Sequence, residues 1–232
     1  MKIRLVLILS LFVTAPYALG QNDSNSSEEL HPFFKAMNFT QRLELPMSSR
    51  VKINLSDVIV RGEIDSVTEG RILAHPEDGL MGPRHTAVIK VKVIKAIKGD
   101  VGEYVYFEYS IGGIPAEYYS ERIYKEPILL MLMEIKLDDA YTTITHSPNG
   151  LMHEVDTLYE LTSQSSLMFV RKSTDSDIGE IGHPLDEHAE DFGGMTLSET
   201  ERLVEEIKNM TEEEWEEEYI RIHSLHASEN EG

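Results

Sequence analysis

Apolar and polar residues alternate with a period of two after Asp57, which is the pattern of a strand with one buried face. The apolar face holds Val58, Val60, Gly62 and Ile64, and the opposite face holds Arg61, Glu63 and Asp65. A second alternating segment, 86–98, places Ile89, Val91 and Val93 on one face and Lys90 and Lys92 on the other. Lys95 interrupts the apolar face of this segment, which indicates a bulge or the end of strand pairing.

Further strands follow, separated by turns. Val105, Phe107 and Tyr109 alternate with polar neighbours after the turn at Gly99. The segment 127–135 is almost continuously apolar, which predicts a strand that is buried on both faces. Weaker strands are expected at 141–145, 151–161 and 166–171, whereas a loop rich in glycine and proline is expected over 69–84.

The region 55–172 therefore holds five to seven strands with short turns and no strong helix, which favours a mainly β domain. Closing such a sheet into a small barrel removes its exposed edges. The expected core residues are Val58, Val60, Ile64, Ile89, Val91, Val93, Val105, Phe107, Leu129, Leu130 and Leu132.

The flanking regions have other patterns. Residues 21–54 are expected to be a leader with a short helical segment, where Phe33, Phe34, Met37 and Phe39 cluster. Residues 173–195 are rich in Asp, Gly, Ser and Glu and are interpreted as an acidic linker or long loop. Two acidic amphipathic helices are predicted over 196–228, because Thr196 with Glu199, and Thr211 with Glu214, have capping-box spacing. An apolar stripe from Leu197 to Ile207 is expected to pack these helices on the barrel.

The first 20 residues have the layout of a secretory signal peptide. Lys2 and Arg4 precede the apolar run 5–13, and Ala18 and Gly20 are small residues at the −3 and −1 positions of a cleavage site. An uncleaved anchor is the alternative. We expect cleavage after Gly20, a secreted or periplasmic protein, and no membrane span after the signal is removed.

The composition of the chain limits the classes of partner and site that are expected. The chain of 232 residues has 41 acidic and 21 basic residues, a net charge of −20, and no cysteine. A field of this sign repels phosphate backbones, so nucleic acid is not expected as a partner, whereas a protein or cationic ligand is. The lack of cysteine excludes disulfides, a catalytic thiol and thiolate metal sites.

Several of these segments carry a resemblance. The sequences SDVIVRGEI from Ser56, VIKVKVIKAIKGD from Val88, VYFEY before a Gly-Gly pair, and PILLML from Pro127 resemble a pattern found in uncharacterised exported bacterial proteins. The same opening is similar to the netrin-like module and the inhibitory domain of tissue inhibitors of metalloproteinases. The resemblance covers roughly 56–135 and implies a small closed OB-like barrel. Those inhibitors chelate zinc through an N-terminal cysteine, so their mechanism is carried onto no residue of this cysteine-free chain.

One segment has the composition of a metal site. His183, Glu187, His188 and Asp191 lie within nine residues and have side chains that can bind a divalent ion. We nevertheless expect a solvated acidic loop without a tightly bound metal, because Pro184 and the nearby glycines oppose the helix that would align these ligands, and the metal site is the alternative. We expect no cofactor. A metal-dependent binding protein or hydrolase that uses this loop is the second functional hypothesis.

The first functional hypothesis is an exported non-catalytic binding or interaction protein, since no nucleophile–base motif is present. Its expected binding rim is formed by the loops 69–84 and 110–122. The candidate contact residues are Tyr109, Tyr118, Tyr119 and Tyr124, because tyrosine buries area at little entropic cost. The alternative is that these tyrosines cap the barrel. Convergence of His146, His153 and a carboxylate in a cleft would instead favour an enzyme.

Overall fold

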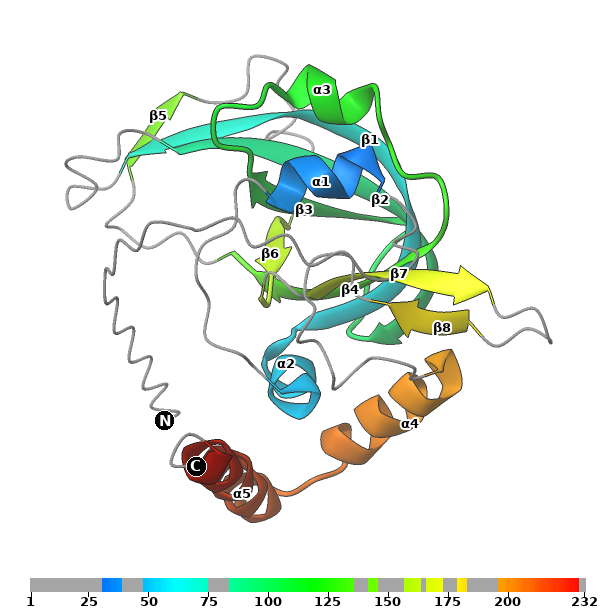
Figure 1. The fold of residues 1–232 in the computed structure, drawn as a ribbon, viewed down its shortest axis with the longest axis vertical. Coiled ribbons are helices and arrows are strands. Elements are labelled where there is room, and N and C mark those ends of the chain that lie inside the picture. Colours follow the sequence, from blue (N-terminus) through cyan, green and yellow to red (C-terminus); the bar gives the residue numbers. More distant parts are fainter. Residues whose placement is uncertain are drawn as a thin grey trace, which may run out of the picture.

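In the computed structural model, the strands of the described residues form one sheet, and the central strands of this sheet close into a ring (Figure 1). The structure describes residues 31–38, 48–74, 84–135, 142–145, 157–163, 166–172, 179–182 and 196–229. The strands are β1 (Val58–Ala74), β2 (Arg84–Lys98), β3 (Tyr104–Ser110), β4 (Ile128–Glu134), β5 (Thr142–Thr145), β6 (Tyr159–Leu161), β7 (Leu167–Lys172) and β8 (Gly179–Gly182). Their order in the sheet is β5-β1-β2-β3-β6-β4-β7-β8.

A ring of five strands arises because β1 also pairs with β4. Residues 58–62 of β1 lie between β2 on one side and β4 on the other. The ring passes from β3 to β4 through β6, which pairs with β3 in parallel where Phe107 faces Tyr159. The expectation of a mainly β fold with helices near the C-terminal end is thereby confirmed, and the sheet is partly closed.

The inner face of the ring holds the main core. Its buried residues on the ring strands are Val58, Val60, Ile64, Val67, Ala87, Ile89, Val91, Val105, Phe107, Ile128, Leu130 and Leu132. Helix α1 (Pro32–Asn38) adds Phe33, Phe34 and Met37 to this core, as the sequence predicts for that cluster. Phe39 and the predicted strand residues 151–156 lie outside the described part of the chain.

Two of the expected core residues are corrected. Val93 is only half-buried and packs against the edge of the inner core. Leu129 points to the other side of the sheet, because neighbouring residues of a strand face opposite ways. It joins Met131 in a second core, so β4 is buried on both faces, as its continuous apolar run predicts.

The second core lies outside the ring, where helices cover β1, β4 and β7 (Figure 1). It combines Ile53 of α2 (Ser49–Leu55), Ile59, Leu129, Met131 and Met168 of the sheet, and Leu203, Val204 and Ile207 of α4 (Leu197–Lys208). Trp215 of α5 (Glu212–Glu229) packs against it. Both predicted capping boxes are present, and the prediction that the apolar stripe packs on the sheet is confirmed for α4.

Four elements differ from the sequence interpretation. Strand β1 continues through residues 69–74, where a loop is expected, because bulges disturb its alternation without ending its pairing. Helix α2 lies within the expected leader, α3 (Ala116–Ser120) lies within the expected all-strand region, and β8 lies within the expected acidic linker. No helix in the described part of the chain is long and apolar enough to cross a membrane.

Candidate binding cleft

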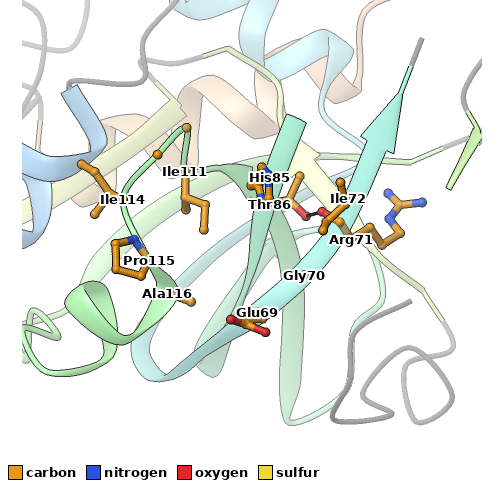
Figure 2. Close-up of a pocket in the computed structure, with 12 residues that line it drawn as sticks. Glu69, Gly70, Arg71, Ile72, His85, Thr86, Ile111, Ile114, Pro115 and Ala116 are labelled. Atoms are coloured by element: carbon orange, nitrogen blue, oxygen red, sulfur yellow. Dashed lines mark hydrogen bonds between the residues drawn. The ribbon is translucent and has the colours of Figure 1, made fainter. Parts of the chain in front are cut away.

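A cleft of about 620 Å³ opens between the end of β1, the start of β2 and the loop from β3 to α3. Residues 69–72 of β1 lie opposite the loop residues Ile111 and Ile114–Ala116 (Figure 2). His85 and Thr86 of β2 lie between these two walls. The cleft therefore joins three segments that are far apart along the chain.

A β-bulge shapes the β1 wall. Glu69 pairs with Ala87 and Ile72 pairs with His85, so Gly70 and Arg71 together oppose one residue of β2. Such an insertion bends the strand and re-aims its side chains. Glycine is required at position 70, since a Cβ atom there would lie 2.4 Å from Thr86 Oγ1.

The bulge places the Arg71 side chain beside the buried carboxylate of Glu108. Arg71 Nε donates to Glu108 Oε1 at 2.9 Å, and its Nη2 donates to Glu108 Oε2. The two side chains are only 3% and 5% exposed. Because β2 lies between β1 and β3, this ion pair ties the two outer strands together across the middle one.

Thr86 completes this network. Its Oγ1 lies 2.7 Å from Glu108 Oε1 and 2.9 Å from the Arg71 carbonyl oxygen, so its hydroxyl proton has two acceptors within reach. A buried charge pair is stable only when its remaining polar atoms also find partners. Arg71 and Thr86 also line the cleft, and Figure 2 shows the guanidinium end of Arg71 pointing away from Ile114 and Pro115, so the network holds the β1 wall in place.

The opposite wall is fixed through its main chain. Ile111 N donates to the His85 carbonyl oxygen at 3.0 Å, and Ile114 N donates to the Ile111 carbonyl oxygen at 3.1 Å. Gly112 has a φ of 57°, which favours glycine in this tight turn. Beside it, Gly113 faces open space, since a Cβ atom there would meet nothing within 4 Å. This wall is therefore a tight turn in which Gly113 faces open space.

The side chains that line the cleft are mostly apolar. Its larger apolar side chains are Ile72, Ile111, Ile114 and Pro115. Glu69 and His85 are exposed and supply the charged or titratable groups at its mouth. Sites that bind ligands commonly combine an apolar lining with a few polar groups that fix orientation.

The four candidate tyrosines gather around α1 and α3 and do not line the cleft. Tyr109 donates a hydrogen bond to the Met37 carbonyl oxygen at 2.9 Å, and the Tyr124 ring centre lies 4.9 Å from that of Phe34. Arg122 lies over the Tyr118 ring at 3.9 Å. All three tyrosines are half-buried against the inner core.

Tyr119 is the fourth, and it is 1% exposed. Its hydroxyl makes no hydrogen bond within the described residues. Burial raises the pKa of this hydroxyl well above the ordinary value, and the nearby Tyr109 and Tyr118 raise it further. The structure thus places the four side chains as a layer over the inner core, and a role for them in binding stays a prediction.

The predicted metal ligands His183, Glu187, His188 and Asp191 lie outside the described residues, as do His146 and His153. Within the part of the chain that the structure describes, no three His, Asp or Glu side chains are grouped to hold a metal ion. The choice between a solvated acidic loop and a metal site at residues 183–191 is therefore not tested.

Sequence reasoning named the two loops that meet at the cleft but missed Arg71, Thr86 and Glu108. One signal was available, because a lone glycine inside a strand pattern indicates a bulge or a close backbone approach. Gly70 stands between two charged residues in this way. No sequence pattern, however, links Arg71 to a carboxylate 37 residues later.

Comparisons with protein-family models, with curated proteins and with solved structures give no match. The resemblance over 56–135 therefore stays an expectation.

Proposed function

We propose that this protein is an exported, non-catalytic binding protein whose ligand occupies the cleft between β1, β2 and the β3–α3 loop. One observation carries the proposal. The two segments that the sequence predicts as the loops of a binding rim, 69–84 and 110–122, contribute residues 69–72 and 111–116 to the opposing walls of a single cleft.

The lining suits binding better than proton or group transfer. Isoleucine and proline side chains gain free energy when a ligand removes them from water. The buried pair of Arg71 and Glu108 holds one wall in place before a ligand arrives, and a preorganised site loses less conformational entropy on binding. Glu69 at the mouth, in a chain of net charge −20, favours a protein or cationic ligand.

The strand order supports a finer assignment, that the ring is an OB-type barrel. Five strands close through β1 pairing with β4, and a short helix, α3, lies between β3 and β4. Barrels of this type bind ligands through loops at the barrel rim. The predicted signal peptide over residues 1–20 supports export, which places the ligand outside the cytoplasm.

The test fills the cleft without disturbing the fold. Gly113→Trp adds a large side chain to the loop wall, where a Cβ atom meets nothing within 4 Å. The matched control is Gly102→Trp, since position 102 is equally open but lies in the turn between β2 and β3. Each variant and the unchanged protein would be used for affinity capture from the exported fraction of the native host.

We expect a partner that the unchanged protein and Gly102→Trp both retain and that Gly113→Trp loses. Recovery of the same partners at the same yield by all three proteins would show that the cleft is not the binding site. Equal melting temperatures of the two variants would confirm that the difference does not come from unfolding.

A further inference from the structure

Helix α1 is too short to be stable by itself. It has seven residues, whereas isolated helices of fewer than about 12–15 residues are marginal in water. Its stability comes from Phe33, Phe34 and Met37, which are at most 1% exposed and belong to the inner core. Figure 1 shows α1 on the concave side of β1, β2 and β3. The helix therefore depends on being docked against the ring.

His31 holds the first turn of α1. Its carbonyl oxygen accepts hydrogen bonds from the N–H groups of Phe34 at 2.9 Å and Lys35 at 3.1 Å. Its Nδ1 accepts a hydrogen bond from the N–H group of Phe33 at 3.3 Å, which is the role of an N-cap side chain. An imidazole nitrogen accepts a hydrogen bond only when it carries no proton. Protonation of Nδ1 would replace this bond with two donors that face each other.

The surroundings of His31 favour the neutral imidazole. Its ring centre lies 5.4 Å from that of Tyr124 and 6.3 Å from that of Phe34, with the rings edge to face. Burial lowers the pKa of His31 below the ordinary value of 6.5. The folded protein then binds fewer protons than the unfolded chain, so the stability that His31 contributes is complete above about pH 6.5 and falls as the pH drops below it.

The neighbouring groups leave histidine as the residue type that changes charge in mild acid. Tyr124 is a titratable residue that contacts His31 from outside α1. Lys35 lies on α1, and Arg122, Lys125 and Glu126 lie within two residues of Tyr124 in the chain. Lysine, arginine, glutamate and tyrosine side chains ordinarily keep their charge state between about pH 7.5 and pH 5.5, whereas histidine titrates in this range.

Helix α1 is connected to the cleft through α3. The Phe33 ring centre lies 5.8 Å from that of Tyr119, again edge to face. The Tyr119 hydroxyl makes no hydrogen bond within the described residues, so packing holds this side chain in place. Ala116, on the same helix, is 3% exposed and lines the cleft. Withdrawal of Phe33 would therefore remove a packing partner of the helix that supports the cleft wall.

We propose that His31 is a proton-sensitive latch on α1. The neutral imidazole keeps α1 docked in the inner core. Its protonation releases α1 and loosens the cleft wall that α3 supports. Release is a property of the protein without a ligand, and only the consequence for binding rests on the proposed function.

Hydrogen exchange measured by mass spectrometry at about pH 7.5 and pH 5.5 tests the latch. Rates are corrected for the intrinsic effect of pH on amide exchange. Residues 31–38 should exchange about threefold faster or more at the lower pH, and residues 116–120 should follow them. Residues 128–134 of β4 should keep their exchange rates, because the ring itself stays folded.

Three variants assign the effect to His31. His31→Asn keeps a capping acceptor that does not titrate, so residues 31–38 should exchange slowly at both pH values. His31→Ala removes the acceptor, so these residues should exchange at the higher pH as fast as those of the unchanged protein exchange at the lower pH. His85→Asn, which removes an exposed histidine at the mouth of the cleft, is the matched control and should keep the pH response of α1.

Three results would each overturn the latch: equal corrected exchange of residues 31–38 at both pH values, the same acceleration in His31→Asn, or slow exchange in His31→Ala at the higher pH. Faster exchange of residues 31–38 without any change in 116–120 would overturn the link to the cleft. Partner capture with Gly113→Trp at about pH 7.5, where the latch is closed, tests the proposed function separately. Failure of either experiment is therefore distinguishable from failure of the other.

Discussion

The two halves of β1 differ in how they pair with their neighbours and in which strand carries the bulges. Residues 58–62 are held between β2 and β4, and the extra residues in their pairing with β2, Ile94 and Ile97, belong to β2. Residues 63–74 are bulged themselves, first at Asp65 and then at Gly70 and Arg71, and no strand that the structure describes pairs with the second side of residues 63–71. The first half contributes to both cores, whereas the second half adds Ile64 and Val67 to the inner core and forms one wall of the cleft with residues 69–72.

This difference shows that the position of the extra residue decides which way the side chains of β1 point. When the extra residue belongs to the neighbour, β1 keeps strict alternation, so Val58 and Val60 face inward and Ile59 faces the outer core. When the extra residue belongs to β1, the alternation shifts. Val67 then faces inward at an odd position, and Arg71 reaches a carboxylate on β3.

The largest effect should come from the doubly paired half. Val60→Asp buries an unpaired carboxylate at a position with 0% exposure, so the free energy of unfolding should fall by more than about 4 kcal/mol. Circular dichroism during urea titration measures it. Ile94→Asp, at a bulge residue with 47% exposure, is the control and should stay within about 0.5 kcal/mol of the unchanged protein. Similar losses from both changes would contradict the assignment of the two faces.

An intermediate effect is expected in the cleft half. Arg71→Met leaves Glu108 buried without its cation and should cost about 3–5 kcal/mol of stability. The double variant Arg71→Met with Glu108→Leu removes both charges, so it should regain most of that loss in the same urea titration. A double variant no more stable than Arg71→Met alone would mean that the ion pair does not dominate this region.

The smallest effect on stability is expected for α4 and α5, the helices that pack outside the ring. The main-chain N–H and then the hydroxyl of Thr196 hold the pKa of Glu199 below its ordinary value, and Thr211 does the same for Glu214. A lowered folded-state pKa contributes stability above the unfolded value, and this contribution is lost as pH falls through the folded value. The helices should therefore loosen below about pH 4.5, the ordinary value for glutamate.

Trp215, the single tryptophan, packs against the outer core and reports this change. Its fluorescence should shift to the red in acid before the ring unfolds, as followed by far-ultraviolet circular dichroism. Glu199→Gln with Glu214→Gln keeps the capping hydrogen bonds without a titrating group, so it should reduce the shift. An identical acid transition in this variant would exclude the capping boxes as its origin.

Sequence reasoning succeeded where local pattern decides structure. The alternation of 58–64 and 86–93, the apolar run of β4, the phenylalanine cluster of α1 and the two capping boxes each depend on neighbours within a few residues. It failed for residues 69–74, where Glu69, Gly70 and Arg71 have the composition of a loop and yet continue β1. Pairing with β2 outweighs local preference there, which is common in sheets.

The sequence by itself therefore determined the mainly β class, most of the inward faces and the starts of α4 and α5, because periodicity and capping are local properties. Only the tertiary structure decided that Leu129 faces outward, that Arg71 meets Glu108, and that the ends of β1 and β2 meet residues 111–116 in one cleft. These features depend on strand order, on register shifts and on contacts between distant residues. A period of two carries no information about any of them.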